Sequence, residues 1–169
     1  MFTKHGFEMQ RIFFAVTMAL LLSACTKEVP ENDKKLTKSV DEKNIQETID
    51  NYYSALNSGD IEKAASFVDY NFRGVLQDMS EIIGINSFTN NLRLAQKKFL
   101  GWKWEIKFNE INVFGDYAYS ITSASILVNN KAIKKLNDVC SEKAIRILKR
   151  QKNGGWKIFR FIAVQDQTK

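Results

Sequence analysis

Histidine is almost absent from this sequence. The single histidine among 169 residues is His5, at the start of the chain. The rest of the chain therefore cannot form a Ser-His-Asp triad, a Cys-His pair or most kinds of zinc site. Any acid–base chemistry there must use Asp, Glu, Tyr or Lys. No phosphate-binding loop or metal-ligand cluster occurs in the sequence either, so we expect no metal and no cofactor.

Cysteine and proline are also scarce. The sequence contains one proline, eight glycines and two cysteines, Cys25 and Cys140. So few prolines and glycines argue against a disordered or fibrous chain. A lipid on Cys25 would leave Cys140 without a partner for an intramolecular disulfide. We expect Cys140 to be a half-buried strand residue, with a reactive thiol or an intermolecular bridge as the alternative.

A hydrophobic run long enough to span a membrane is missing. The uncharged run from Ile12 to Leu22 is about half of the roughly 20 residues that a membrane-spanning helix needs. It follows Lys4 and Arg11, which is typical of a secretory signal. The run ends in Leu22-Ser23-Ala24-Cys25, which resembles the bacterial lipobox. We therefore predict a lipoprotein signal peptide over residues 1–24, with an uncleaved anchor or a buried N-terminal helix as the alternative.

Cys25 would then carry the lipid that attaches the protein to a membrane. Each buried methylene contributes about 0.8 kcal/mol, so the two or three acyl chains of a lipoprotein cysteine give stable attachment. Thr26 stands where an Asp commonly retains Gram-negative lipoproteins in the inner membrane. We therefore expect a cell-envelope protein, on the outer membrane and facing the periplasm if the source is Gram-negative. Residues 25–43 predict a lipidated cysteine and a flexible, highly charged tether, and residues 44–169 predict one domain.

The charge balance is basic. Residues 1–24 contain Lys4, Arg11 and Glu8, so their removal lowers the net charge from +6 to +5. A basic balance can indicate nucleic acid or anionic lipid as a partner. The basic residues are scattered, and an exported protein rarely meets nucleic acid, so we expect a solvated surface and no nucleic-acid partner. Attraction to anionic headgroups near the anchor is the alternative.

Hydrophobic periodicity predicts helices followed by strands. The expected helices cover residues 45–58, 61–68 and 85–99. The expected strands cover residues 103–113, 117–128, 140–152 and 155–164, with a bulge near Asn109-Glu110. Residues 69–83 allow a short strand and a turn, and residues 129–138 predict a polar loop. The pattern is typical of an α+β fold in which three N-terminal helices pack on a strongly curved antiparallel β-sheet.

The last two strands predict a hairpin whose register can be read from the sequence. Asn153-Gly154 is typical of a two-residue turn, which places Ile147 opposite Arg160. We expect the more apolar face of the hairpin to join the core. That face carries Ile145, Ile147, Trp156, Ile158, Ile162 and Val164. The other face mixes Leu148, Phe159 and Phe161 with Arg146, Arg150 and Lys157, and it either contacts a second copy of the chain or meets solvent.

Three stretches together resemble the NTF2-like (cystatin-like α+β) superfamily, near its SnoaL-like and DUF4440-type branches. They are Tyr52-Tyr53-Ser54-Ala55-Leu56-Asn57-Ser58-Gly59-Asp60, Gly115-Asp116-Tyr117-Ala118 and Lys149–Ile158. The resemblance implies a cone in which helices close a curved sheet over an internal pocket. Members of the superfamily include isomerases, dehydratases, polyketide cyclases and non-catalytic binding domains. The resemblance therefore implies the fold more firmly than the function.

We place the candidate ligand site inside this cone. If Ala118 faces the core, so do Ser120 and Thr122, and these small side chains leave room opposite helices that bear Tyr53 and Phe67. A buried Arg160 would need a partner, because an unpaired buried charge costs several kcal/mol. That partner is an anionic ligand; the alternatives are a salt bridge to Asp69 or Asp78, or a place for Arg160 at the rim of the sheet. The candidate ligand-binding residues are Tyr53, Phe67, Trp104, Ser120, Thr122 and Arg160, with a core role as the alternative for Trp104.

The sequence assigns no residue a catalytic role. We expect a lipid-anchored, non-catalytic domain that binds a small, partly apolar molecule or an envelope protein. Its outer sheet face either forms a homodimer or meets solvent. The first alternative is a cofactor-free isomerase or lyase, similar to ketosteroid isomerase, that uses Asp69 or Asp78. The second is a dimeric structural module with a filled cone. An open pocket that contains a carboxylate favours the enzyme.

Overall fold

The computed structural model describes residues 31–130 and 138–166. The chain divides into two compact units, residues 1–36 and 37–169, and the following description concerns the second unit. The predicted signal peptide, Cys25 and the first residues of the predicted tether lie outside the described residues.

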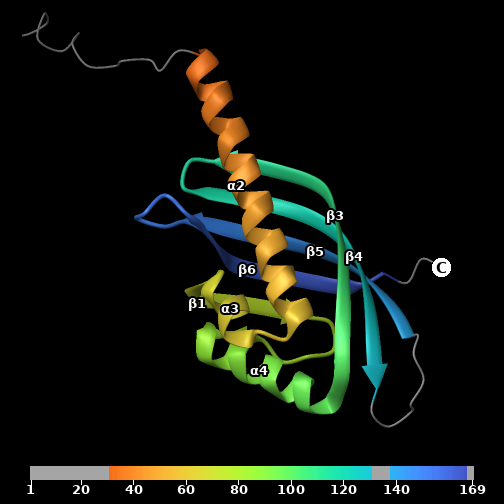
Figure 1. The fold of residues 1–169 in the computed structure, drawn as a ribbon. Coiled ribbons are helices and arrows are strands. Elements are labelled where there is room, and N and C mark those ends of the chain that lie inside the picture. The colour runs from red at the N-terminus through yellow and green to blue at the C-terminus, as the bar shows by residue number, and fades with distance from the viewer. Residues whose placement is uncertain (1–30, 131–137, 167–169) are drawn as a thin grey trace, which may run out of the picture. The chain divides into compact units, whose positions relative to one another are not determined.

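Three helices lie on one face of a curved, six-stranded sheet (Figure 1). The helices are α2 (Glu31–Ser58), α3 (Ile61–Ser66) and α4 (Gly84–Lys98). The strands are β1 (Val68–Leu76), β2 (Ile82–Ile83), β3 (Phe99–Phe114), β4 (Tyr117–Asn130), β5 (Asp138–Arg150) and β6 (Trp156–Gln165). Their order is β2-β1-β6-β5-β4-β3, and every pair is antiparallel except β1 and β6. The predicted α+β class is confirmed, although one edge of the expected antiparallel sheet contains this parallel pair.

The first helix begins earlier than predicted. Residues 31–43 were expected to be tether, yet they belong to α2. Charged residues in this stretch form (i, i+4) pairs, Lys38 with Glu42 and Lys43 with Glu47, each at 3.8 Å. Asp41 is buried at 5% exposure and pairs with Arg150. The high charge density of residues 31–43 therefore belongs to a solvated helix and not to a flexible tether. The predicted tether boundary at residue 43 was wrong.

Several local signals act as predicted. Gly59 has a φ of +75° and ends α2, and the Asp60 carboxylate accepts the Lys63 N–H at 3.0 Å at the start of α3. The pairing of β3 with β4 shifts between Phe108 and Glu110, which confirms the bulge. The ambiguous stretch 69–83 contains most of β1 and the short strand β2.

The final hairpin turns differently, and the predicted core face was wrong. Arg150 pairs with Trp156 around a turn closed by the Gln151 N–H on Gly155 O at 2.7 Å, so the turn is one residue longer than predicted. A register shift between Ile147 and Leu148 then restores Ile147 opposite Arg160. Trp156 and Ile158 therefore stay inside with Leu148, while the other aliphatic residues lie outside. These exposed residues are Ile145, Ile147, Ile162 and Val164.

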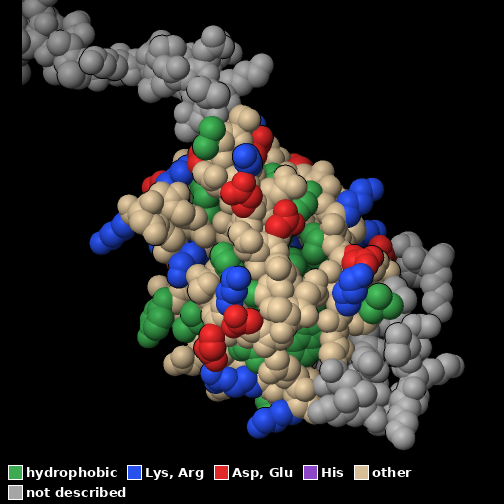
Figure 2. Space-filling model, viewed as in Figure 1, with side chains coloured by type: hydrophobic (Ala, Val, Ile, Leu, Met, Phe, Trp, Pro, Cys, Tyr) green, Lys and Arg blue, Asp and Glu red, His purple; other side chains and the backbone are tan. Residues whose placement is uncertain are grey.

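Charges of both signs are interspersed over the helix-bearing face (Figure 2). This distribution fits the solvated surface that the scattered basic residues predicted. Within the described ranges, no helix is long and apolar enough to cross a membrane.

Candidate functional site in the cone

A partly open cavity of about 310 Å³ lies between the helices and the sheet. Aromatic side chains provide much of its wall. They are Tyr52, Tyr53, Phe72, Phe88, Trp102, Trp104 and Phe161. Leu56, Leu92 and Ile126 add aliphatic surface. The cavity contradicts a filled cone, and its lining favours an apolar guest.

Among the residues that the structure describes, Glu142 on β5 is the only carboxylate in the cavity wall. Its Oε1 atom is buried without a hydrogen-bond partner among the described residues. Burial raises the pKa of Glu142 to about 7, because the apolar surroundings disfavour the charged form. The group can therefore be protonated or ionised near neutral pH. Asp69 and Asp78 were the carboxylates predicted for this place, but neither lines the cavity, so the prediction was wrong. Asp69 instead accepts the Asn71 N–H at 2.9 Å.

Arg146 lies on the same face of β5 as Glu142, because side chains four residues apart on a strand point to one side. Arg146 is completely buried. Its Nη1 donates to Thr122 Oγ1 at 2.6 Å, and its Nη2 donates to the Tyr53 hydroxyl. The guanidinium carbon also lies 4.7 Å from the centre of the Phe161 ring. Burial lowers the pKa of Arg146 to about 10, so the side chain remains a cation at neutral pH.

Tyr53 connects the buried cation to the cavity. It lies on α2, and its ring packs against Tyr52 and Trp104 at centroid distances of 5.0 and 5.4 Å. The Tyr53 oxygen accepts from Arg146, so its own proton is available to a guest in the cavity. Burial raises the pKa of the neighbouring Tyr52 above its usual range, so this side chain also stays a neutral phenol. The cavity thus combines a carboxyl group with a cation-supported hydroxyl.

The structure separates the six predicted ligand-binding residues. Tyr53 and Trp104 line the cavity. Ser120 and Thr122 are fully buried as expected, but they are not among the residues that line the cavity. Phe67 ends α3 and packs against the core.

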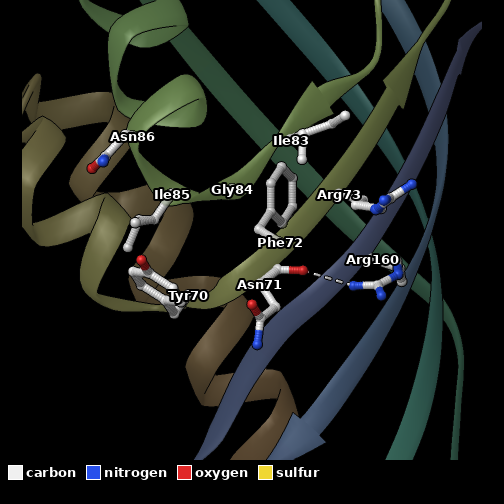
Figure 3. Close-up of a pocket in the computed structure, with 9 residues that line it drawn as sticks. All are labelled: Tyr70, Asn71, Phe72, Arg73, Ile83, Gly84, Ile85, Asn86 and Arg160. Atoms are coloured by element: carbon white, nitrogen blue, oxygen red, sulfur yellow. Dashed lines mark hydrogen bonds between the residues drawn. The ribbon is translucent and has the colours of Figure 1, made fainter.

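Arg160 lies away from the cavity, which corrects its predicted place on the core face. The longer hairpin turn and the register shift turn its side chain outward with Ile147. It lines an outer groove with Arg73, and its Nη1 donates to the Asn71 carbonyl at 2.9 Å (Figure 3). The buried guanidinium belongs to Arg146 instead.

Sequence reasoning missed Glu142 and Arg146. Both occupy every second position along β5 together with Ala144 and Leu148, so alternation along the strand places the four side chains on one face. The competing face carries Ile145 and Ile147 and looked more apolar. No group of three or more potential metal ligands occurs among the residues that the structure describes.

No protein-family model matches the sequence, and no curated protein matches it. Solved structures do match. A ketosteroid isomerase-like protein from Erwinia carotovora atroseptica gives a TM-score of 0.69 at 14% identity, over 75% of this chain and 97% of its own. An NTF2-like superfamily protein from Salmonella enterica serovar Typhimurium gives 0.70 at 13% identity, over 77% and 94%. An NTF2-like protein with a cystatin-like fold from Novosphingobium aromaticivorans gives 0.68 at 13% identity, over 85% and 94%. This chain therefore has the NTF2-like, cystatin-like fold that its motifs predicted.

Proposed function

We propose that this protein is a lipid-anchored component of the bacterial cell envelope whose domain binds a small, largely apolar molecule in the cone. The observation that carries the proposal is the 310 Å³ cavity with its largely aromatic and aliphatic wall. The unpartnered Oε1 of Glu142 would accept a hydrogen bond from the guest, because an unsatisfied buried acceptor is costly. The anchor part of the proposal rests on Cys25 and the residues before it.

A fluorescent apolar probe with one N–H donor, N-phenyl-1-naphthylamine, tests this proposal. The unlipidated chain from residue 26 should bind it in a saturable way. Ala95 lines the cavity, whereas its neighbour Leu94 is 64% exposed. Ala95→Phe should therefore weaken probe binding, and the matched control Leu94→Phe should leave it unchanged. Equal affinity in both variants would refute binding in the cone.

A second candidate function, a cofactor-free isomerase, is favoured by Glu142 itself. An ionised Glu142 could take the α proton of a β,γ-unsaturated ketone and return it at the γ carbon. The Tyr53 hydroxyl, supported by Arg146, would donate to the carbonyl oxygen as negative charge develops there. The test is isomerisation of 3-cyclohexen-1-one. Enzymatic turnover should rise with pH around 7 and disappear in Glu142→Gln, while the naphthylamine probe still binds that variant.

The same proposal includes a homodimer through the outer sheet face. Ile145 and Ile162 are register partners, and with Ile147 and Val164 they form an aliphatic stripe on β5 and β6. Each of these side chains is between 39% and 51% exposed. A stripe of this kind can pack on its own copy across a twofold axis. The aliphatic face, rather than the mixed face named from the sequence, is therefore the candidate contact.

A further inference from the structure

The outer groove is separate from the cavity in the cone. It has a volume of about 440 Å³ and lies where β1, β6 and the start of α4 meet (Figure 3). Of the described residues, Phe72 alone lines both hollows. A ligand in the groove would therefore occupy a second site.

Two arginines lie opposite each other in this groove. Arg73 on β1 and Arg160 on β6 are register partners across neighbouring strands. In Figure 3 their side chains lie together at one end of the groove. Like charges directly opposite one another destabilise a sheet pair unless something compensates them. The first turn of α4, which forms another part of the groove wall, carries no acidic residue.

The protein compensates these charges only in part. Arg73 contacts Glu81 at 3.3 Å, with both side chains more than a third exposed, and such exposed pairs are weak. Arg160 forms no ion pair with a carboxylate in the described part of the chain. Its Nη1 donates to the Asn71 and Phe159 carbonyls at 2.9 and 2.8 Å, and its guanidinium lies 3.4 Å from the centre of the Phe159 ring. These contacts fix the orientation of the guanidinium plane. The Nε and Nη2 donors of Arg160 have no protein acceptor among the described residues.

We propose that this groove binds an oxyanion, a carboxylate or a phosphate, carried on a short apolar body. A planar guanidinium held in place matches the two oxygens of such a group, and the opposing Arg73 adds a second positive charge. Tyr70 and Ile83 also line the groove and are 76% and 57% exposed, so they offer apolar surface for the rest of the ligand. The Asn71 and Asn86 side chains supply polar contacts at the groove wall.

Calorimetric titration of the purified full chain with phenyl phosphate and with benzoate tests the proposal. At least one probe should bind with one site, and benzyl alcohol should not bind. Arg160→Gln and Arg73→Gln should each weaken binding at least about tenfold, because a charge-assisted hydrogen bond is lost. Lys152→Gln removes an equal charge from the exposed β5–β6 turn and should leave binding unchanged. Glu142→Gln should also leave it unchanged, which separates this site from the cone.

Vesicles then identify the natural source of the oxyanion. Displacement of phenyl phosphate by phosphatidylglycerol vesicles but not by phosphatidylcholine vesicles indicates a lipid headgroup, and no displacement indicates a soluble ligand. Absence of saturable binding by both probes would overturn the proposal. So would an equal loss of affinity in Lys152→Gln. Arg73 is about half exposed, so its variant keeps the test decisive even if Arg160→Gln does not fold.

Discussion

Asp41 and Arg150 form a two-pronged ion pair that joins the helix α2 to the end of β5. Arg150 Nη1 and Nη2 donate to the two Asp41 oxygens at 2.8 and 2.7 Å, although 109 positions separate the residues in sequence. The Arg150 guanidinium also lies 4.3 Å from the centre of the Trp156 ring. A helix segment that looked like a tether is thereby held on the domain.

We expect Asp41→Asn to lower the free energy of unfolding by about 2 kcal/mol, because it weakens a largely buried, charge-assisted pair. Glu42→Gln is the matched control, since Glu42 makes only a partly exposed pair with Lys38 and should cost less than about 0.5 kcal/mol. Urea unfolding measures both variants. Equal losses would contradict a structural role for Asp41.

The same pair predicts a dependence of stability on acid pH. Arg150 lowers the pKa of Asp41 below its ordinary value of 3.8. The pair therefore contributes its full stabilisation above pH 3.8, and this contribution disappears as the pH falls through the lowered pKa. The difference in stability between wild type and Asp41→Asn should shrink in that range.

Glu142 predicts the opposite dependence at higher pH. Its pKa is raised from 4.5 to about 7, so the folded state holds this proton more tightly than the unfolded state. Stability should fall as the pH rises from about 4.5 to 7, by up to about 3 kcal/mol. Glu142→Gln should remove this decline, as followed by chemical unfolding at several pH values. A decline that persists unchanged in the variant would show that other groups cause it.

Thr122 and Ser120 offer a matched pair on one face of β4. Thr122 Oγ1 accepts from the buried Arg146, whereas Ser120 Oγ is buried without a partner in the described structure. Thr122→Val should cost about 1–3 kcal/mol, because it leaves a guanidinium N–H unsatisfied. Ser120→Ala should be neutral or stabilising. Thermal unfolding that ranks the variants in the reverse order would contradict the assignment of hydrogen bonds.

The predicted lipid anchor can be tested at Cys25. Cys25→Ala should move the protein from the membrane fraction to the soluble fraction, because the acyl chains that would hold it can no longer be attached. Labelling cells with a radioactive fatty acid should mark the wild type but not the variant. Unchanged membrane attachment of the variant would refute the anchor.

The aliphatic stripe predicts the oligomeric state. Ile147→Glu places a charge in the centre of the proposed contact and should convert a dimer to a monomer in analytical ultracentrifugation. Leu94→Glu introduces the same charge at an exposed position on α4 and should not change the mass. A monomeric wild type would exclude the dimer.

Local chemistry made much of the fold predictable. The Asp60 cap, the Gly59 helix end and the bulge before Glu110 each depend on a few neighbouring residues, so their signals are complete in the sequence. The inward direction of Ser120 and Thr122 followed from simple alternation along β4. The cavity residues Tyr53 and Trp104 were found because helical and strand periodicities placed them on inward faces.

By itself, the sequence determined the α+β class, most of the element boundaries and the exclusion of histidine chemistry beyond His5. Only the tertiary structure decided that Arg146 and Glu142 face the interior while Ile145 and Ile147 face outward. A turn one residue longer and one register shift changed which hairpin residues share a face. Tyr53 on α2 and Thr122 on β4 then accept from the two Nη groups of the buried cation, and no local pattern encodes partners so distant in sequence.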